Sequence, residues 1–183
     1  MTPVSDRLAA TVREASALDH AVYAAVAGAG TPSIDRELAA LSRAADHSKL
    51  WLGCAAGLAL GGGPRGRRAA VRGLAAIAVA SGGVNLGVKL LSRRRRPDRA
   101  DVPEARHVPM PISSSFPSGH AASAFAFATA AGHGLVAVDL PLRVLATAVA
   151  YSRIHVGVHY PGDVLVGALI GGAAGNAVAA IRR

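Results

Sequence analysis

The sequence predicts an all-α membrane protein: a polytopic helical bundle with about five transmembrane helices, preceded by N-terminal amphipathic helices. Apolar residues make up 51% of its 183 residues and gather in long runs that are nearly free of charge. The charged residues cluster in the segments between these runs, whereas a soluble domain intersperses charges over its whole surface. We therefore divide the chain into N-terminal interfacial helices, residues 1–47, and a transmembrane core, residues 48–183.

The charge balance favours anionic lipids or a phosphorylated substrate as partners. The chain has 20 Lys and Arg residues against 11 Asp and Glu, a net charge of +9, which would also suit nucleic acid. Aromatic residues make up only 4% of the chain, however, and the basic residues lie between apolar runs, so we expect no nucleic-acid partner. The single cysteine, Cys54, provides neither an internal disulfide nor a cysteine metal cluster.

Two amphipathic helices are predicted at the N-terminus. Residues 4–27 have apolar side chains at helical spacing with charges between them. Gly28, Gly30 and Pro32 end this helix. Ser33 is the expected N-cap of a second helix, because an acidic residue falls in its first turn and leucines follow. We expect these helices to lie in the membrane interface or to pack on the bundle.

Apolar runs separated by short polar segments fill the rest of the chain. The first is short for a bilayer crossing, which needs at least about 17 residues, and a basic loop at residues 63–68 follows it. Residues 92–116 form a loop in which consecutive arginines and repeated prolines exclude helix. The expected spans are residues 49–63, 71–91, 118–138, 141–156 and 164–181.

This order of spans brings the polar segments to two faces. The loop at 92–116 and the turn at 157–162 share one face with the N-terminus, so every residue with evident chemistry is expected there. Raw Lys and Arg counts favour that face as cytoplasmic. Once the cations of the expected site are discounted, the arginines of residues 63–68 and of the C-terminus mark the opposite face as cytoplasmic. We expect a multi-pass protein of the cell membrane with an extracytoplasmic site.

Two stripes of glycine at every fourth position let helices approach closely. They favour either packing within one chain or a homo-oligomer. The stripes are Gly53, Gly57 and Gly61 in the first run and Gly167, Gly171 and Gly175 in the last.

Residues 152–163, SRIHVGVHYPGD, concentrate ionisable side chains between two apolar runs, where charge is costly to maintain. The chain also supplies cations at span ends and a helix N-terminus at PSGH. Guanidinium groups and free helix N–H groups together suit a phosphate group. The expected phosphate ligands are Lys89, Arg96, Arg153 and the free backbone N–H groups of Ser118 and Gly119.

Two histidines and one aspartate suffice for covalent phosphoryl transfer. His159 and Asp163 share a helix face if the last span begins near His159, and the carboxylate would then aim the imidazole at phosphorus. His120 is placed to protonate the leaving oxygen and later to deprotonate water. His155 is expected to be a packing residue. Residues 93–95 are expected to be solvated or lipid-facing arginines, with recognition of a diphosphate or an anionic headgroup as the alternative.

Three blocks occur along the chain in the order KLLSRRRRP, PSGH and SRIHVGVHYPGD. They match the signature K-x6-RP, PSGH and SR-x5-H-x3-D of the type 2 phosphatidic acid phosphatase family. Residues 89–163 therefore resemble that family. The resemblance implies a metal-independent phosphatase without a cofactor and with a phosphohistidine intermediate. His159 would be the nucleophile, Asp163 its partner, and His120 the acid and base. Membrane members commonly have six spans, so the N-terminal architecture departs from the family. The implied phosphate-binding residues are Lys89, Arg96, Ser118, Gly119, Ser152 and Arg153.

The resemblance implies a lipid phosphate as substrate: phosphatidic acid, phosphatidylglycerophosphate, or a polyprenyl phosphate or diphosphate. The composition resembles that of high-GC actinobacterial proteins, whose small family members act on polyprenyl-linked phosphates of cell-wall synthesis, including decaprenyl-phosphoryl-phosphoribose. Two other classes stay open. One is a vanadate-dependent peroxidase, because the resemblance extends to the vanadium haloperoxidases, although those proteins are soluble. The other is a lipid-headgroup binding protein, which would need neither both histidines nor Asp163.

Overall fold

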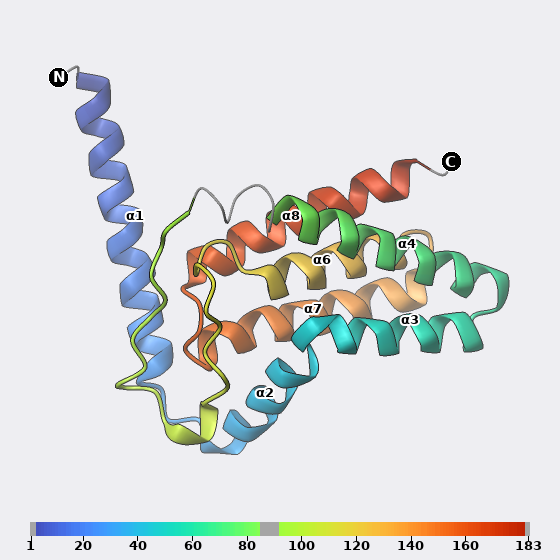
Figure 1. Ribbon diagram of the computed structural model, residues 1–183, viewed down its shortest axis with the longest axis horizontal. Coiled ribbons are helices and arrows are strands. Elements are labelled where there is room, and N and C mark those ends of the chain that lie inside the picture. The colour runs from blue at the N-terminus through green and yellow to red at the C-terminus, as the bar shows by residue number, and fades with distance from the viewer. Residues whose placement is uncertain (1–2, 85–91, 182–183) are drawn as a thin grey trace.

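The structure, a computed structural model, describes residues 3–84 and 92–181. Within these ranges it contains seven α-helices and no strand (Figure 1), so the predicted all-α class is confirmed. The α-helices are α1 (Pro3–Ala27), α2 (Pro32–Ala44), α3 (Lys49–Gly61), α4 (Gly63–Gly82), α6 (Gly119–Gly132), α7 (Val136–His155) and α8 (Pro161–Ala180). Single turns of 3-10 helix occur at η1 (Asp46–Ser48) and η3 (Glu104–Arg106).

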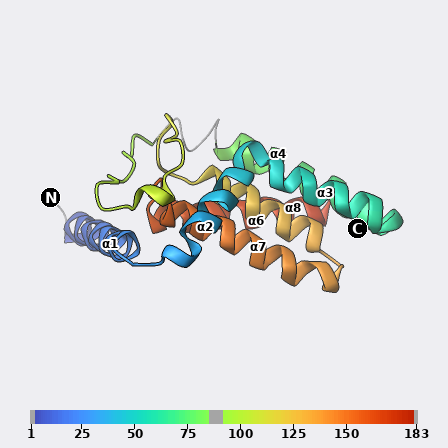
Figure 2. The same ribbon diagram turned by 90° about the horizontal axis from the view of Figure 1, so that it is seen from below.

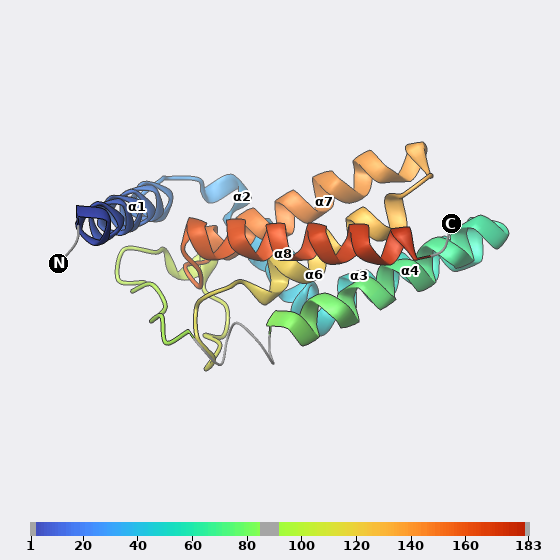
Figure 3. The same ribbon diagram turned by 90° about the horizontal axis from the view of Figure 1, so that it is seen from above.

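Helix α6 forms the centre of the bundle. It packs against α4, α7 and α8, and Figure 3 shows it behind α8, between α4 and α7. Most of its residues are buried, and most of these are alanine, because small side chains let neighbouring helices approach closely. Trp51 of α3 and Phe127 of α6 fill the core beside them, with ring centroids 5.4 Å apart.

The glycine stripe of α8 packs inside the chain. A Cβ atom at Gly167 would overlap the carbonyl oxygen of Ser118, and one at Gly171 would overlap that of Ala122. Because the clashing atoms belong to the backbone of α6, they cannot move aside as a flexible side chain would. Of the two interpretations of this stripe, packing within the chain is therefore the one that the structure supports.

The stripe of α3 differs. A Cβ atom at Gly53, Gly57 or Gly61 would meet no atom within 4 Å in the described part of the chain. A homo-oligomer that uses α3 stays a prediction.

Adjacent glycines of α8 provide a direct test of this packing. Gly171→Ala is expected to lower the free energy of unfolding by about 1–3 kcal/mol, the usual cost of overpacking. Gly172→Ala is the matched control, because a Cβ atom there meets nothing within 4 Å and alanine favours helix by up to about 1 kcal/mol. Thermal unfolding in detergent measures both. Equal stability of the two variants would contradict close packing of α8 on α6.

Some predicted boundaries were wrong. The basic residues 63–68 are not a loop: they form the first turns of α4, because Pro64 suits the start of a helix and the chain reverses at Gly63, whose φ is +57°. The N-cap of α2 is Thr31 and not Ser33. Helix α7 begins at Val136, and Pro141 lies within it.

The predicted meeting of polar segments at one face is confirmed. Helix α6 begins, α7 ends and α8 begins at the same end of the bundle (Figure 1). The loop that contains residues 92–116 lies against this end, where Arg96 donates a hydrogen bond to the Val158 carbonyl oxygen at 2.7 Å. Figure 1 also shows α1 crossing this end at a steep angle to the bundle, and Figure 2 shows it beyond the helix ends.

The helices match the five expected apolar runs, but their lengths and compositions differ. Among the described residues, α8 alone is both long and apolar enough to meet a length-and-hydropathy criterion for crossing a membrane. Helix α4 begins with several arginines and α6 runs only from Gly119 to Gly132.

Candidate active site

His159 lies in the turn between α7 and α8. The turn requires Gly157, whose φ is +72°, and the backbone N–H of His159 donates to the Arg153 carbonyl oxygen at 3.2 Å. The His159 side chain is buried. Its Nδ1 lies 3.6 Å from Asp163 Oδ2, slightly beyond a hydrogen bond, and its Nε2 lies 3.3 Å from a guanidinium nitrogen of Arg96. The predicted juxtaposition of His159 and Asp163 is therefore present.

The electrostatic environment keeps His159 neutral. Burial, together with the nearby guanidinium groups of Arg96 and Arg153, lowers the pKa of His159 to about 4. At neutral pH one ring nitrogen therefore carries no proton and is available as a nucleophile.

Asp163 is fully buried and is held by several donors. Its Oδ2 accepts from the Tyr160 backbone N–H at 2.9 Å, which caps α8, and from the Ser115 hydroxyl at 2.5 Å. Its Oδ1 accepts from Arg94 at 2.8 Å. These contacts from the 92–116 loop and from the start of α8 fix the carboxylate beside His159.

His120 occupies the first turn of α6. Its Nε2 lies 2.9 Å from Asp46 Oδ1. Ser118 is the N-cap of this helix, and its hydroxyl accepts from the Ala121 N–H at 3.4 Å. The expectation of a free Ser118 N–H was wrong, because this group donates to the Asp163 carbonyl oxygen at 2.9 Å. That bond joins the starts of α6 and α8.

The predicted cations have different surroundings. Arg96 donates to backbone carbonyls as well as facing His159. Arg153 is buried and donates to the Ser42 hydroxyl at 2.5 Å. The hydroxyl of Ser152 donates to the Val149 carbonyl within α7 at 2.7 Å, so its part in phosphate binding stays a prediction. Lys89 lies outside the described residues.

A cavity of about 600 Å³ brings the central groups together. His159, His120, Arg96 and Gly119 all line it, and Asp46 lines the same cavity. Two histidines, a guanidinium group and the first turn of α6 line one open volume. The arrangement can hold a phosphate group and transfer protons to and from it.

His155 lies away from this cavity, in agreement with its predicted packing role. Its Nε2 lies 3.0 Å from Asp35 Oδ1, and the same carboxylate accepts from Arg106 Nε at 2.9 Å. Arg106 also donates to backbone carbonyls of residues 26, 27 and 29. This buried cluster fastens the start of α2 and the end of α1 to the bundle.

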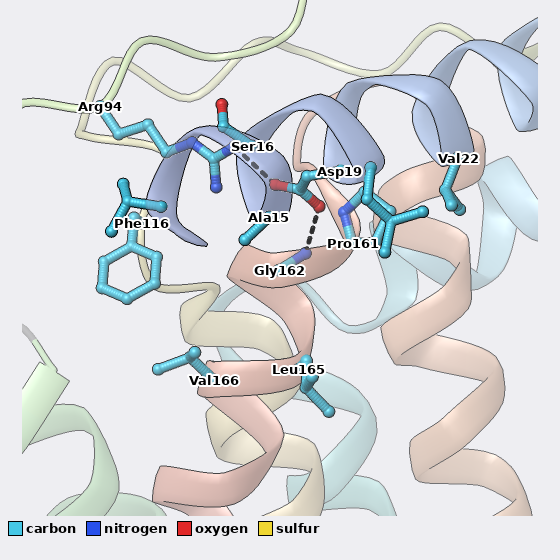
Figure 4. Close-up of a pocket in the computed structure, with 12 residues that line it drawn as sticks. Ala15, Ser16, Asp19, Val22, Arg94, Phe116, Pro161, Gly162, Leu165 and Val166 are labelled. Carbon is cyan, nitrogen blue, oxygen red and sulfur yellow. Dashed lines mark hydrogen bonds and ion pairs between the residues drawn. The ribbon is translucent and has the colours of Figure 1, made fainter. Parts of the chain in front are cut away.

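Residues 93–95 were expected to be solvated or lipid-facing, and this expectation was wrong for Arg94, which makes specific contacts. It binds Asp163 and also Asp19 of α1, at 2.5 Å, and its guanidinium group lies over the Tyr160 ring at 4.4 Å from the centroid. Figure 4 shows Asp19 between Arg94 and the Gly162 N–H, which it accepts at 2.7 Å. These contacts surround a second cavity of about 620 Å³, lined largely by apolar side chains of α1 and α8.

Sequence reasoning missed the carboxylates of Asp19 and Asp46 and the hydroxyl of Ser115. Each comes from a segment whose composition is ordinary for an interfacial helix or a polar loop. Their roles depend on contacts between segments that are distant in the sequence.

Residues 70–183 match the profile of the PAP2 superfamily. The chain is 46% identical over 92 residues to the decaprenylphosphoryl-5-phosphoribose phosphatase of Mycobacterium tuberculosis, covering 50% of this chain and 49% of the relative. It thus spans about half the length of that relative. It is 39% identical over 149 residues to the phosphatase of that description from Mycolicibacterium smegmatis, covering 80% and 77% of the two chains.

Solved structures also match. The chain aligns with Aquifex aeolicus LpxE with a TM-score of 0.72 and 26% identity, covering 88% of this chain and 94% of that one. It aligns with the first transmembrane PAP2 type phosphatidylglycerolphosphate phosphatase from Bacillus subtilis with a TM-score of 0.72 and 23% identity, covering 92% and 86%. The second likeness is one of fold.

Proposed function

This chain belongs to the PAP2 superfamily, and we propose that it is an integral membrane phosphatase that hydrolyses a lipid phosphate through a phosphohistidine intermediate. The observation that carries the proposal is the position of His159. This neutral imidazole faces Asp163 on one side and Arg96 on the other, in a cavity that it shares with His120.

The first half-reaction forms the phosphohistidine. His159 Nε2 attacks phosphorus, and the bond from phosphorus to the lipid oxygen breaks. Asp163 accepts the Nδ1–H as the 3.6 Å separation shortens, since catalytic hydrogen bonds are often long before substrate binds. His120 gives its proton to the departing lipid oxygen, so this oxygen leaves as a neutral hydroxyl group.

The second half-reaction regenerates the enzyme. His120 accepts a proton from water, whose oxygen attacks phosphorus. The bond from phosphorus to His159 breaks, and inorganic phosphate leaves. Arg96 and Arg153 would hold the charge on the non-bridging oxygens, with Lys89, the first turn of α6 and Ser152 completing the phosphate site.

We propose that α3, α4, α6, α7 and α8 cross the membrane and that residues 1–47 lie at its surface. Large apolar side chains face outward from the bundle, among them Leu60, Val144 and Leu169, which lipid would cover. Helix α1 crosses the end of the bundle at which the site lies (Figure 1). We place that end outside the cytoplasm. Arg67 lies at the opposite end, in the first turns of α4. Labelling of Arg67→Cys by an impermeant reagent added outside intact cells would contradict this orientation.

The proposed substrate is a polyprenyl-linked phosphate, with a glycerolipid phosphate as the alternative. The first choice is supported by the activity that the names of the mycobacterial relatives state, and the second is a substrate that the family resemblance implies. Purified protein should be assayed for phosphate release from decaprenyl-phosphoryl-phosphoribose phosphate, polyprenyl diphosphate, phosphatidylglycerophosphate and phosphatidic acid. Release from none of them would reject the proposed function.

Chelation tests the mechanism separately. No group of at least three His, Cys, Asp or Glu side chains is arranged to hold a metal ion within residues 3–84 and 92–181, and guanidinium groups are available for the phosphate charge. We expect excess EDTA to leave the rate of phosphate release unchanged. A strict requirement for a divalent cation, restored on its addition, would contradict the proposed mechanism.

A further inference from the structure

Asp46 supplies a carboxylate to the active-site cavity from outside the segment that matches the family profile. It lies in η1, between α2 and α3, whereas the profile match covers residues 70–183. The Asp46 side chain is 34% exposed and lines the cavity that contains His120 and His159. Its Oδ1 is 2.9 Å from His120 Nε2 and 3.8 Å from a guanidinium nitrogen of Arg153.

The backbone around Asp46 is strained. His47 and Ser48 have φ values of 54° and 60°, in the left-handed region that glycine favours. Such a conformation costs about 1–3 kcal/mol per residue and persists where neighbouring structure imposes it. Here the left-handed residues interrupt the chain between α2 and α3. The Asp46 carboxylate beside them lies against His120 in the first turn of α6.

We propose that Asp46 is the positioning residue for His120, the acid and base of the proposed phosphatase reaction; the inference rests on that function. An imidazole has two nitrogens. Because Nε2 is bonded to Asp46, Nδ1 is the nitrogen left to give a proton to the lipid oxygen and to take one from water. The carboxylate fixes the ring rotation and tautomer and balances the ring charge while His120 holds its proton.

The surroundings of Asp46 differ from those of a structural carboxylate. Asp35 is buried and joins Thr31, Arg106 and His155. Asp46 instead opens to the cavity and contacts two groups of the proposed site. The site therefore contains two histidine–carboxylate pairs, one from the family signature and one from the N-terminal segment. Because Asp46 would itself repel a phosphate, its loss should not weaken substrate binding.

Substrates with different leaving groups separate positioning from folding. Phosphatidic acid releases an alcohol, whose oxygen needs a proton, whereas 4-nitrophenyl phosphate releases a stable phenolate that does not. Asp46→Asn is expected to lower kcat on phosphatidic acid by about 10²-fold, within the range for general acid–base catalysis, with KM unchanged or lower. On 4-nitrophenyl phosphate, formation of the phosphohistidine, measured as a burst of nitrophenol, should proceed at nearly the rate of the unsubstituted protein.

The controls make each outcome decisive. Asp46→Glu, which keeps a carboxylate, should recover part of the loss on phosphatidic acid. Asp139→Asn removes an ion pair with Arg143 on α7 and should leave both substrates unaffected. If Asp46→Asn lowers the burst rate on 4-nitrophenyl phosphate as much as it lowers kcat on phosphatidic acid, or does not lower kcat on phosphatidic acid, the positioning role is overturned while the phosphatase function stays intact. An unsubstituted protein that releases phosphate from neither of these substrates nor from any of the lipid phosphates named above would overturn both.

Discussion

His159→Ala is expected to abolish phosphate release, with a fall in kcat of at least about 10⁴-fold, as for other enzymes that lose a covalent nucleophile. Neither neighbouring signature-region histidine takes its place, because His120 Nε2 is held by Asp46 and His155 Nε2 is held by Asp35 away from the cavity. Phosphate release from purified protein in detergent measures the effect. The expected loss is the largest of any single substitution in the chain.

His133→Gln is the matched control for this experiment. His133 is exposed at the opposite end of the bundle, between α6 and α7, so its replacement should leave the rate unchanged. Brief incubation with a ³²P-labelled substrate should give an acid-labile protein label in the unsubstituted enzyme and none in His159→Ala. Full phosphate release by His159→Ala would exclude the phosphohistidine mechanism.

Asp163→Asn is expected to lower kcat by about 10²–10⁴-fold with KM close to that of the unsubstituted protein, since the carboxylate orients His159 without contacting phosphate. An amide in this position would also turn an N–H group toward one of the donors that now bind the carboxylate, Arg94, Ser115 and the Tyr160 N–H. The free energy of unfolding should therefore fall by about 1–3 kcal/mol.

Two further variants distinguish orientation from stability. Ser115→Ala removes one donor but keeps the carboxylate, so its loss of kcat should be smaller than that of Asp163→Asn. Asp101→Asn changes an exposed carboxylate of the same loop and should alter neither rate nor stability. A KM increase in Asp163→Asn as large as its kcat decrease would contradict an orienting role.

Much of the fold was predictable because its signals are local. Each apolar run became a helix, since hydrophobic length and proline position act within a few turns of the chain. The prediction for the basic segment at 63–68 was wrong. Its charge indicated a loop, but Gly63 and Pro64 begin α4 there. Charge alone does not exclude helix where long arginine side chains can reach water or headgroups.

The sequence by itself determined the family signature and the residues of its three blocks, because their spacing and order are properties of the chain. Its spacing also predicted the pair of His159 and Asp163. Only the tertiary structure decided which carboxylates from outside the three blocks reach the site. Asp46 reaches His120, and Asp19 reaches Arg94, across separations of 74 and 75 residues. Such pairs depend on how α1 and η1 pack against α6 and α8, and no local spacing encodes that packing.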